Sequence, residues 1–262
     1  MTAFENRIQE IGAAAEVLLP EGPGPFPVLV QLHGCGGRGR NQRRWAEVAR
    51  ARGVAACILD SFAFRGIGRA EALATVCTGL RLWGRERAGD LFAGMAFLRR
   101  QPWADGRRLA AAGWSHGGWS VLEAMALRED QRARCTGLAH LPSEPLAGLC
   151  GAFVMYPYLG RAALAPRLGL DHPAPVCAIV GGRDRTVGAR TPMAALAAML
   201  ARGGDVRAHL FETATHDFDE PCEEGGLRAP ASRYDPALTR AAETLLERFL
   251  EEVFTSGPRG PP

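Results

Sequence analysis

Short apolar segments alternate with longer helical patterns along almost the whole chain, and no other feature limits the possible folds as strongly. Segments such as Val28–Leu32 and Leu109–Trp114 are apolar nearly throughout, which is typical of strands buried on both faces of a parallel sheet. Between them, Glu86–Arg100 carries apolar residues at helical spacing. The pattern predicts an α/β protein with a mainly parallel central sheet and helices on both faces. Further strands are expected at Val54–Leu59, Ala152–Tyr156, Val176–Val180 and Val206–Phe211.

The chain shows no internal repeat and no interdomain linker. We therefore expect one domain, residues 1–254, followed by a disordered tail, residues 255–262. About 19 residues separate the strands that end at Tyr156 and begin at Val176, too few for a large cap domain. The segment Ser61–Arg85 is long enough to fold over a site instead. Further helices are expected at Arg44–Arg52, at Met193–Arg202 after a start signal at Thr191-Pro192, and after Asp235-Pro236.

Composition argues against several classes of function. No run approaches the roughly 18 consecutive apolar residues of a membrane-spanning helix. All 31 basic residues are arginine, but 28 acidic residues nearly balance them and the arginines form no stripe, which argues against nucleic-acid binding. The N-terminal residues lack the pattern of a secretory signal. We expect a soluble, cytoplasmic protein that binds neither nucleic acid nor membranes.

The seven cysteines have no regular spacing and include no CxxC pair, so we expect no metal site. Cys57 and Cys177 lie in apolar runs and are expected in the core. Cys77 and Cys222 lie in loop-like segments, and whether they pair stays open. The odd number of cysteines fits a reducing compartment best.

The segment with the most chemical information is LAAAGWSHGGWS, residues 109–120. It places Ser115 between Gly113 and Gly117 at the junction of a predicted strand and a predicted helix. This is the pattern of a nucleophile elbow, a sharp turn that projects a serine hydroxyl above the edge of a sheet. Glycine is needed two residues to either side, because side chains there would collide with the neighbouring strand and helix.

A serine hydroxyl needs a base to remove its proton, and the base needs an orienting acid. On this fold the acid and then the histidine follow the serine, each just beyond a strand. Asp184 directly follows Val176–Val180, and His216 directly follows Val206–Phe211. We therefore expect Ser115, Asp184 and His216 to form a catalytic triad.

Hydrolysis through a tetrahedral intermediate also needs backbone N–H groups that face the developing negative charge. One is expected from His116, the residue after the nucleophile, at the N-terminus of a helix. The other is expected from Cys35, in the glycine-rich segment HGCGG that follows Val28–Leu32. His33 is expected to support its own loop, and Asp217 and Asp219 to be solvated or to cap nearby N–H groups.

The motifs HGCGG, DSFAFRG, GWSHGG, GGRDRTV and THDFDEP occur in an order that resembles the dienelactone hydrolase family of α/β-hydrolases. The resemblance spans about residues 25–253. It implies hydrolysis of a small carboxylic ester or lactone through an acyl-enzyme at Ser115, without metal or organic cofactor. Dienelactone hydrolase itself uses a cysteine nucleophile, so Ser115 favours a more general serine esterase. Of the arginines that hold a substrate carboxylate in that family, Arg65 is a candidate counterpart, although an ion-pair role is favoured for it.

Two alternatives stay open. Residues Gly34–Gly39 also match the dinucleotide-binding pattern GxGxxG, and Asp60 ends the next strand at the position of a ribose-binding acid, which would suit an NAD(P)-dependent oxidoreductase. The loop-like stretch Arg38–Arg40 argues against this, because the pattern needs a helix to start there. The other alternative is a non-catalytic ligand-binding protein that keeps the hydrolase scaffold.

Overall fold

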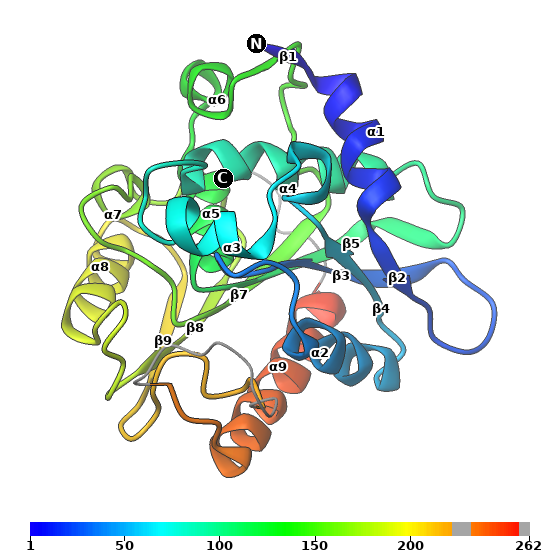
Figure 1. Ribbon diagram of the computed structural model, residues 1–262. Coiled ribbons are helices and arrows are strands. Elements are labelled where there is room, and N and C mark those ends of the chain that lie inside the picture. Colours follow the sequence, from blue (N-terminus) through cyan, green and yellow to red (C-terminus); the bar gives the residue numbers. More distant parts are fainter. Residues whose placement is uncertain (222–231, 257–262) are drawn as a thin grey trace.

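The computed structural model describes residues 1–221 and 232–256, which form a seven-stranded sheet between two layers of helices (Figure 1). The strand order is β2-β4-β3-β5-β7-β8-β9, and every neighbouring pair is parallel except β2 and β4. This confirms the predicted α/β class with a mainly parallel sheet. The strands are β2 (Glu16–Leu18), β3 (Phe26–Leu32), β4 (Ala55–Leu59), β5 (Ala104–Trp114), β7 (Leu149–Met155), β8 (Val176–Gly181) and β9 (Val206–Phe211).

The two helical layers enclose two separate apolar cores. One core lies between the sheet and α1, α4, α5 and α8, and the other lies between the sheet and α2 and α9 (Figure 1). The central strands are therefore buried on both faces, which explains why their sequences are apolar rather than alternating. The helices are α1 (Phe4–Ala14), α2 (Arg40–Ala51), α4 (Gly84–Leu98), α5 (His116–Ala126), α6 (Glu129–Thr136), α7 (Ala165–Leu168), α8 (Arg190–Ala201) and α9 (Pro236–Ser256).

The predicted start of the last helix, α9, is confirmed, whereas the predicted start of α8 is wrong. Asp235 accepts hydrogen bonds from the N–H groups of Ala237 and Leu238, so it caps α9 as expected. In contrast, α8 begins at Arg190, which places Thr191 inside the first turn instead of at the cap. Helix α9 runs through residues 255 and 256, the first two of the predicted disordered tail; residues 257–262 lie outside the described part.

Sequence patterns missed one helix of 11 residues and several short strands. Helix α1 and the short edge strand β2 were not expected, nor was a separate two-stranded ladder between β1 (Thr2–Ala3) and β6 (Leu138–Ala139). Strands of two or three residues carry too few positions for a periodicity to be recognised. Within the described ranges, no helix combines the length and the apolar character needed to cross a membrane.

The segment between β4 and α4 folds into three short helical pieces: η1 (Ala63–Arg65), α3 (Arg69–Glu71) and η2 (Ala72–Val76). It has an apolar cluster of its own, against which Cys35 packs; the cluster consists of Phe62, Ile67, Ala72, Val76 and Leu82. We call residues 61–83 the covering segment, because its apolar cluster packs against Cys35 of the glycine-rich loop.

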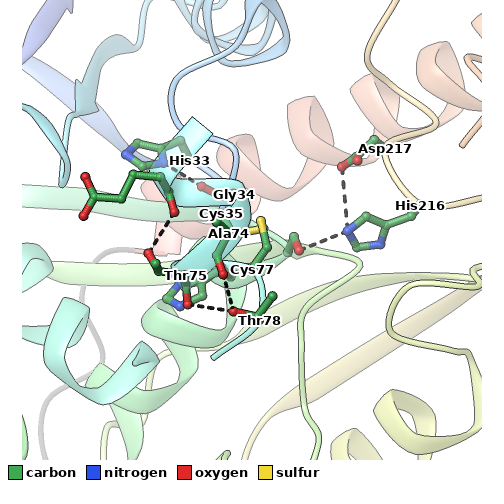
Figure 2. The surroundings of a disulfide bond; sticks show 12 residues. His33, Gly34, Cys35, Ala74, Thr75, Cys77, Thr78, His216 and Asp217 are labelled. Carbon is green, nitrogen blue, oxygen red and sulfur yellow. Dashed lines mark hydrogen bonds and ion pairs between the residues drawn. A yellow bond between two sulfur atoms is a disulfide. The ribbon is translucent and has the colours of Figure 1, made fainter. Parts of the chain in front are cut away.

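A disulfide joins Cys35 to Cys77, with a Cα–Cα distance of 5.2 Å (Figure 2). Cys77 is therefore not available to Cys222, so the pairing of Cys77 with Cys222 that the sequence left open is wrong; Cys222 itself lies outside the described residues. Cys57 and Cys177 are buried free thiols, as predicted. Because a disulfide is typical of oxidising compartments, the cysteines no longer favour a reducing one.

Candidate active site

Ser115 lies in a sharp turn between β5 and α5 with φ 51° and ψ −112°, a backbone conformation that a residue with a side chain rarely adopts. The Ser115 N–H donates to the carbonyl oxygen of Met155 at 2.9 Å, which ties the turn to the next strand. A Cβ atom at Gly113 would lie 2.5 Å from the carbonyl oxygen of Gly117, and one at Gly117 would overlap the carbonyl oxygen of Leu32. The two glycines are thus a steric requirement of this turn.

His216 lies between Ser115 and Asp184, and all three side chains are buried. Its Nε2 atom is 3.0 Å from Ser115 Oγ, and its Nδ1 atom is 2.7 Å from Asp184 Oδ2. Because a carboxylate only accepts hydrogen bonds, Nδ1 carries the proton and Nε2 is free to accept the serine proton. The structure therefore brings together the three side chains that the sequence singled out.

Asp184 is itself held in place by its own loop. Its Oδ1 atom accepts hydrogen bonds from the N–H groups of Thr186 at 2.8 Å and Val187 at 3.0 Å, which leaves Oδ2 for His216. These two bonds form the local turn that an aspartate after a strand often makes. The turn and the contact with the histidine coexist, because they use different oxygens of one carboxylate.

The surroundings of His216 act on its pKa in opposite directions. Burial disfavours the imidazolium and lowers the pKa, whereas the hydrogen bond to Asp184 and the negative charges of Asp217, Asp184 and Asp219 raise it. The net result is a pKa above the ordinary value of histidine. A base with such a pKa takes up the serine proton more readily than an isolated imidazole does.

The glycine-rich loop after β3 lies directly beside the serine. A Cβ atom at Gly34 would be 3.7 Å from the Cβ of Ser115. Figure 2 shows Cys35 between His33 and the disulfide partner Cys77. Both predicted oxyanion donors thus come from segments that border Ser115.

His33 supports its own loop, as expected. Its Nδ1 atom is 2.7 Å from the carbonyl oxygen of Gly34, and its Nε2 atom accepts from the N–H of Ser61 at 3.2 Å. Arg65 forms a two-pronged ion pair with the buried Asp90, with distances of 2.7 and 2.9 Å. Arg65 is therefore a structural ion-pair partner and not a free clamp for a substrate carboxylate.

Asp219 corrects an expectation, because it is fully buried rather than solvated. Its carboxylate accepts from Trp45 Nε1 at 2.7 Å, Trp114 Nε1 at 3.1 Å and the Tyr156 hydroxyl at 2.6 Å. Tyr156 also packs against the His216 ring, with 4.7 Å between the ring centres. Asp219 thus links the loop that carries the histidine to the residue before the nucleophile. Only its position in THDFDEP, three residues after the histidine, could have drawn attention to it.

The site holds no evident place for a metal. Within residues 1–221 and 232–256, no group of three or more His, Cys, Asp or Glu side chains is arranged to bind an ion. The dinucleotide pattern is only partly satisfied. Helix α2 does begin directly after Gly39, contrary to the expected loop. However, Asp60 already accepts from the N–H groups of Phe62 and Ala63 and pairs with Arg38 at 3.0 Å.

Comparisons with known proteins point to one fold. A model of the prolyl oligopeptidase family matches residues 46–140. A comparison with curated protein sequences gives no match. Among solved structures, a dienelactone hydrolase-like promiscuous phosphotriesterase, P91, from metagenomic libraries is 21% identical with a TM-score of 0.67, and the alignment covers 92% of both chains. A protein designated m3DLH is 23% identical with a TM-score of 0.70, again over 92% of both chains.

Esterase 2 of Thermogutta terrifontis is also similar, at 18% identity and a TM-score of 0.65 over 91% of this chain and 89% of that one. At these identities the likeness concerns the fold. In this chain β3, β5, β8 and β9 run parallel, so all four strands end at the sheet edge where Ser115 lies. The chain described here therefore has the fold shared by dienelactone hydrolase-like proteins and esterases, that of the α/β-hydrolases.

Proposed function

We propose that this protein is a serine hydrolase that cleaves a carboxylic ester or lactone through an acyl-enzyme. The observation that carries the proposal is the continuous line of hydrogen bonds from Ser115 Oγ through His216 to Asp184, at a strained turn beside a glycine-rich loop. Each atom in this line has the donor or acceptor role that nucleophilic catalysis requires. The shared fold adds support, because this fold hosts esterases.

In the proposed mechanism, His216 Nε2 takes the proton of Ser115 as Oγ attacks the ester carbonyl carbon. The carbonyl oxygen becomes negative and is stabilised by the N–H groups of Cys35 and His116. The intermediate collapses when His216 gives its proton to the leaving alcohol, which leaves an ester on Ser115. A water molecule, deprotonated by His216, then attacks this ester, and the carboxylic acid departs as Ser115 recovers its proton.

The expected substrates are small esters without an obligatory carboxylate. Arg65, the candidate carboxylate clamp, is already paired with Asp90. The nucleophile is a serine, where dienelactone hydrolase uses a cysteine. Both points favour a general esterase over a dienelactone hydrolase. The chemistry proposed here needs no metal or organic cofactor, and we expect the partner to be a small molecule, neither nucleic acid nor membrane.

Labelling with a fluorophosphonate probe, followed by peptide mass mapping, tests the proposal directly. We expect one adduct, on Ser115, and hydrolysis of p-nitrophenyl acetate by the same preparation. Ser115→Ala should lose the adduct and lower kcat by several orders of magnitude. Ser120→Ala is a matched control, because this buried serine lies in α5, the helix that directly follows Ser115, and its hydroxyl donates to the carbonyl oxygen of His116. A folded wild-type protein that takes up no label would contradict the proposal.

A further inference from the structure

A line of buried polar groups joins the two segments that carry the proposed oxyanion donors. At one end, His33 Nε2 accepts from the backbone N–H of Ser61 at 3.2 Å. Ser61 Oγ accepts from Arg87 Nε at 3.1 Å. At the other end, Arg87 Nη1 lies 3.0 Å from His116 Nδ1. The side chains of His33, Ser61, Arg87 and His116 are all buried, and Arg87 has 0% exposure.

The chemistry of arginine fixes the direction of these bonds. A guanidinium group only donates, so His116 Nδ1 accepts and the imidazole is neutral with its proton on Nε2. Burial, assisted by the charge of Arg87, lowers the pKa of His116 to about 3, in agreement with a neutral ring. Nε and Nη1 point along different edges of the planar group, so one side chain reaches Ser61 and His116 at once.

The nearest carboxylate, Asp90, is paired with other arginines, so the N–H groups of Arg87 are available for Ser61 and His116. Asp90 accepts from Arg7 at 2.7 Å and takes the two-pronged bond from Arg65, so its oxygens are already occupied. Asp90 still offsets the charge of Arg87 from nearby. Burial lowers the pKa of Arg87 to about 10, which leaves the guanidinium charged near neutral pH. Its Nη2 atom is buried and has no hydrogen-bond partner among the described residues.

We propose that Arg87 is a positioning residue that holds both sides of the oxyanion hole in register, acting through Ser61 and His33 on one side and through His116 on the other. The inference rests on the proposed hydrolase function. The two donors come from different segments, and a misplacement of about 1 Å in an active site can lower the rate by about 100-fold. A rigid buried link between the loops is the kind of support such a hole needs.

The test compares Arg87→Met with Arg99→Met. Arg99 is a matched control, because it is a part-buried arginine after the last turn of the same helix, α4, and donates to the backbone carbonyl of Ala147. Active sites are counted by fluorophosphonate labelling, so that rates refer to folded, reactive enzyme. The readouts are kcat and KM for p-nitrophenyl acetate and the inhibition constant of 1,1,1-trifluoro-2-octanone, whose adduct with serine carries an oxyanion.

For Arg87→Met we expect kcat per active site to fall by about 10- to 100-fold, with KM within about twofold of wild type. The trifluoromethyl ketone should bind more weakly by a similar factor, since its oxyanion uses the same donors. Arg99→Met should leave kcat per active site and inhibitor affinity unchanged. A folded Arg87→Met with wild-type kcat, or with reduced kcat but unchanged inhibitor affinity, would overturn the inference.

If Arg87→Met does not fold, Ser61→Ala decides the question. It removes the oxygen that receives Arg87 Nε but keeps the backbone N–H that binds His33. Parallel losses of kcat and inhibitor affinity support the positioning role, and unchanged values of both refute it. Failure of the underlying function would look different, because the wild-type protein itself would then take up no label.

Discussion

At the scale of single residues, the proposed base has a pKa set by a balance of opposing influences. Burial of His216 favours the neutral ring, and three nearby carboxylates favour the charged one. Only the neutral ring can take the proton of Ser115. Since the pKa of His216 is raised, the neutral fraction decreases as the pH falls through a value above the ordinary 6.5. Activity should therefore be lost on the acid side earlier than for an unperturbed histidine.

This predicts that log kcat/KM falls with a slope of one below a midpoint that exceeds pH 6.5. Asp184→Asn removes the contribution that raises the pKa most, so its midpoint should move to lower pH. The same change should reduce kcat by on the order of 10⁴-fold, because Nδ1 loses the acceptor that fixes the tautomer. A pH–rate profile of both proteins checks this. A midpoint that does not move in Asp184→Asn would argue against His216 as the titrating group.

A second single residue, Asp219, is expected to contribute to the free energy of unfolding. It satisfies three buried donors, those of Trp45, Trp114 and Tyr156. A buried donor left without a partner costs about 1–3 kcal/mol, so Asp219→Ala should lower the free energy of unfolding by at least about 3 kcal/mol. Urea unfolding followed by tryptophan fluorescence measures this. Glu21→Ala, at an exposed loop position, should change it by less than about 0.5 kcal/mol. Similar values for the two variants would contradict the structural role of Asp219.

At the scale of elements, the covering segment and the glycine-rich loop are joined by apolar packing and by a disulfide. The covering segment has only a small apolar cluster of its own, and Cys35 of the loop packs against that cluster. The disulfide between Cys35 and Cys77 closes this contact covalently (Figure 2). Cys35 also supplies a proposed oxyanion donor. We therefore expect the position of this donor to depend on the conformation of the covering segment.

The disulfide leads to a prediction for Cys77→Ser. The bond spans 42 residues, for which the chain-entropy model gives a stabilisation of about 4 kcal/mol as an upper value. We expect a lower thermal midpoint and a lower kcat per labelled active site, since the loop of Cys35 loses its tether. Treatment of wild type with dithiothreitol should have the same two effects.

Cys135→Ser is the control, because Cys135 is a partly exposed free thiol whose own sequence position lies outside the covering segment. It should match wild type in both measurements. If Cys77→Ser retained the wild-type midpoint and kcat, the disulfide would have no part in ordering the loop.

At the scale of the whole molecule, the strand order decides where chemistry can occur. The loop after β3 leads to β4 on one side of the sheet, whereas the loop after β5 leads to β7 on the other side. The two loops therefore diverge at the sheet edge between β3 and β5. Ligands of open α/β sheets bind at such a point. In this protein the glycine-rich loop and the nucleophile elbow both lie at this point of the sheet edge. A hydrolase site and a dinucleotide site would therefore occupy the same position.

The structure favours the hydrolase, and this predicts that NADH does not bind. The acid that would hold the ribose, Asp60, is engaged by its own turn and by Arg38. The glycine-rich loop also packs closely against the elbow, where Gly34 approaches Ser115. Titration with NADH, followed by its fluorescence, should show no saturation up to millimolar concentration. Saturable binding that is weakened by Asp60→Ala would revive the oxidoreductase alternative.

The sequence by itself determined the class of fold, most of the longer elements and the three side chains proposed to do the chemistry. Apolar runs and helical spacing are local signals, and they located β8, β9 and the core of α4 within a few residues. Ser115, Asp184 and His216 could be selected because each follows a strand, and parallel strands deliver such residues to one edge. Their order along the chain was therefore enough.

Only the tertiary structure decided what surrounds those residues. Asp219 meets Trp45 across 174 positions, and Arg87 meets His116 across 29, on elements whose own sequences do not indicate a partner. The pairing of Cys35 with Cys77 depends on how the covering segment returns to the loop after β3. Such contacts result from the packing of whole elements against one another, and local periodicity contains no information about them.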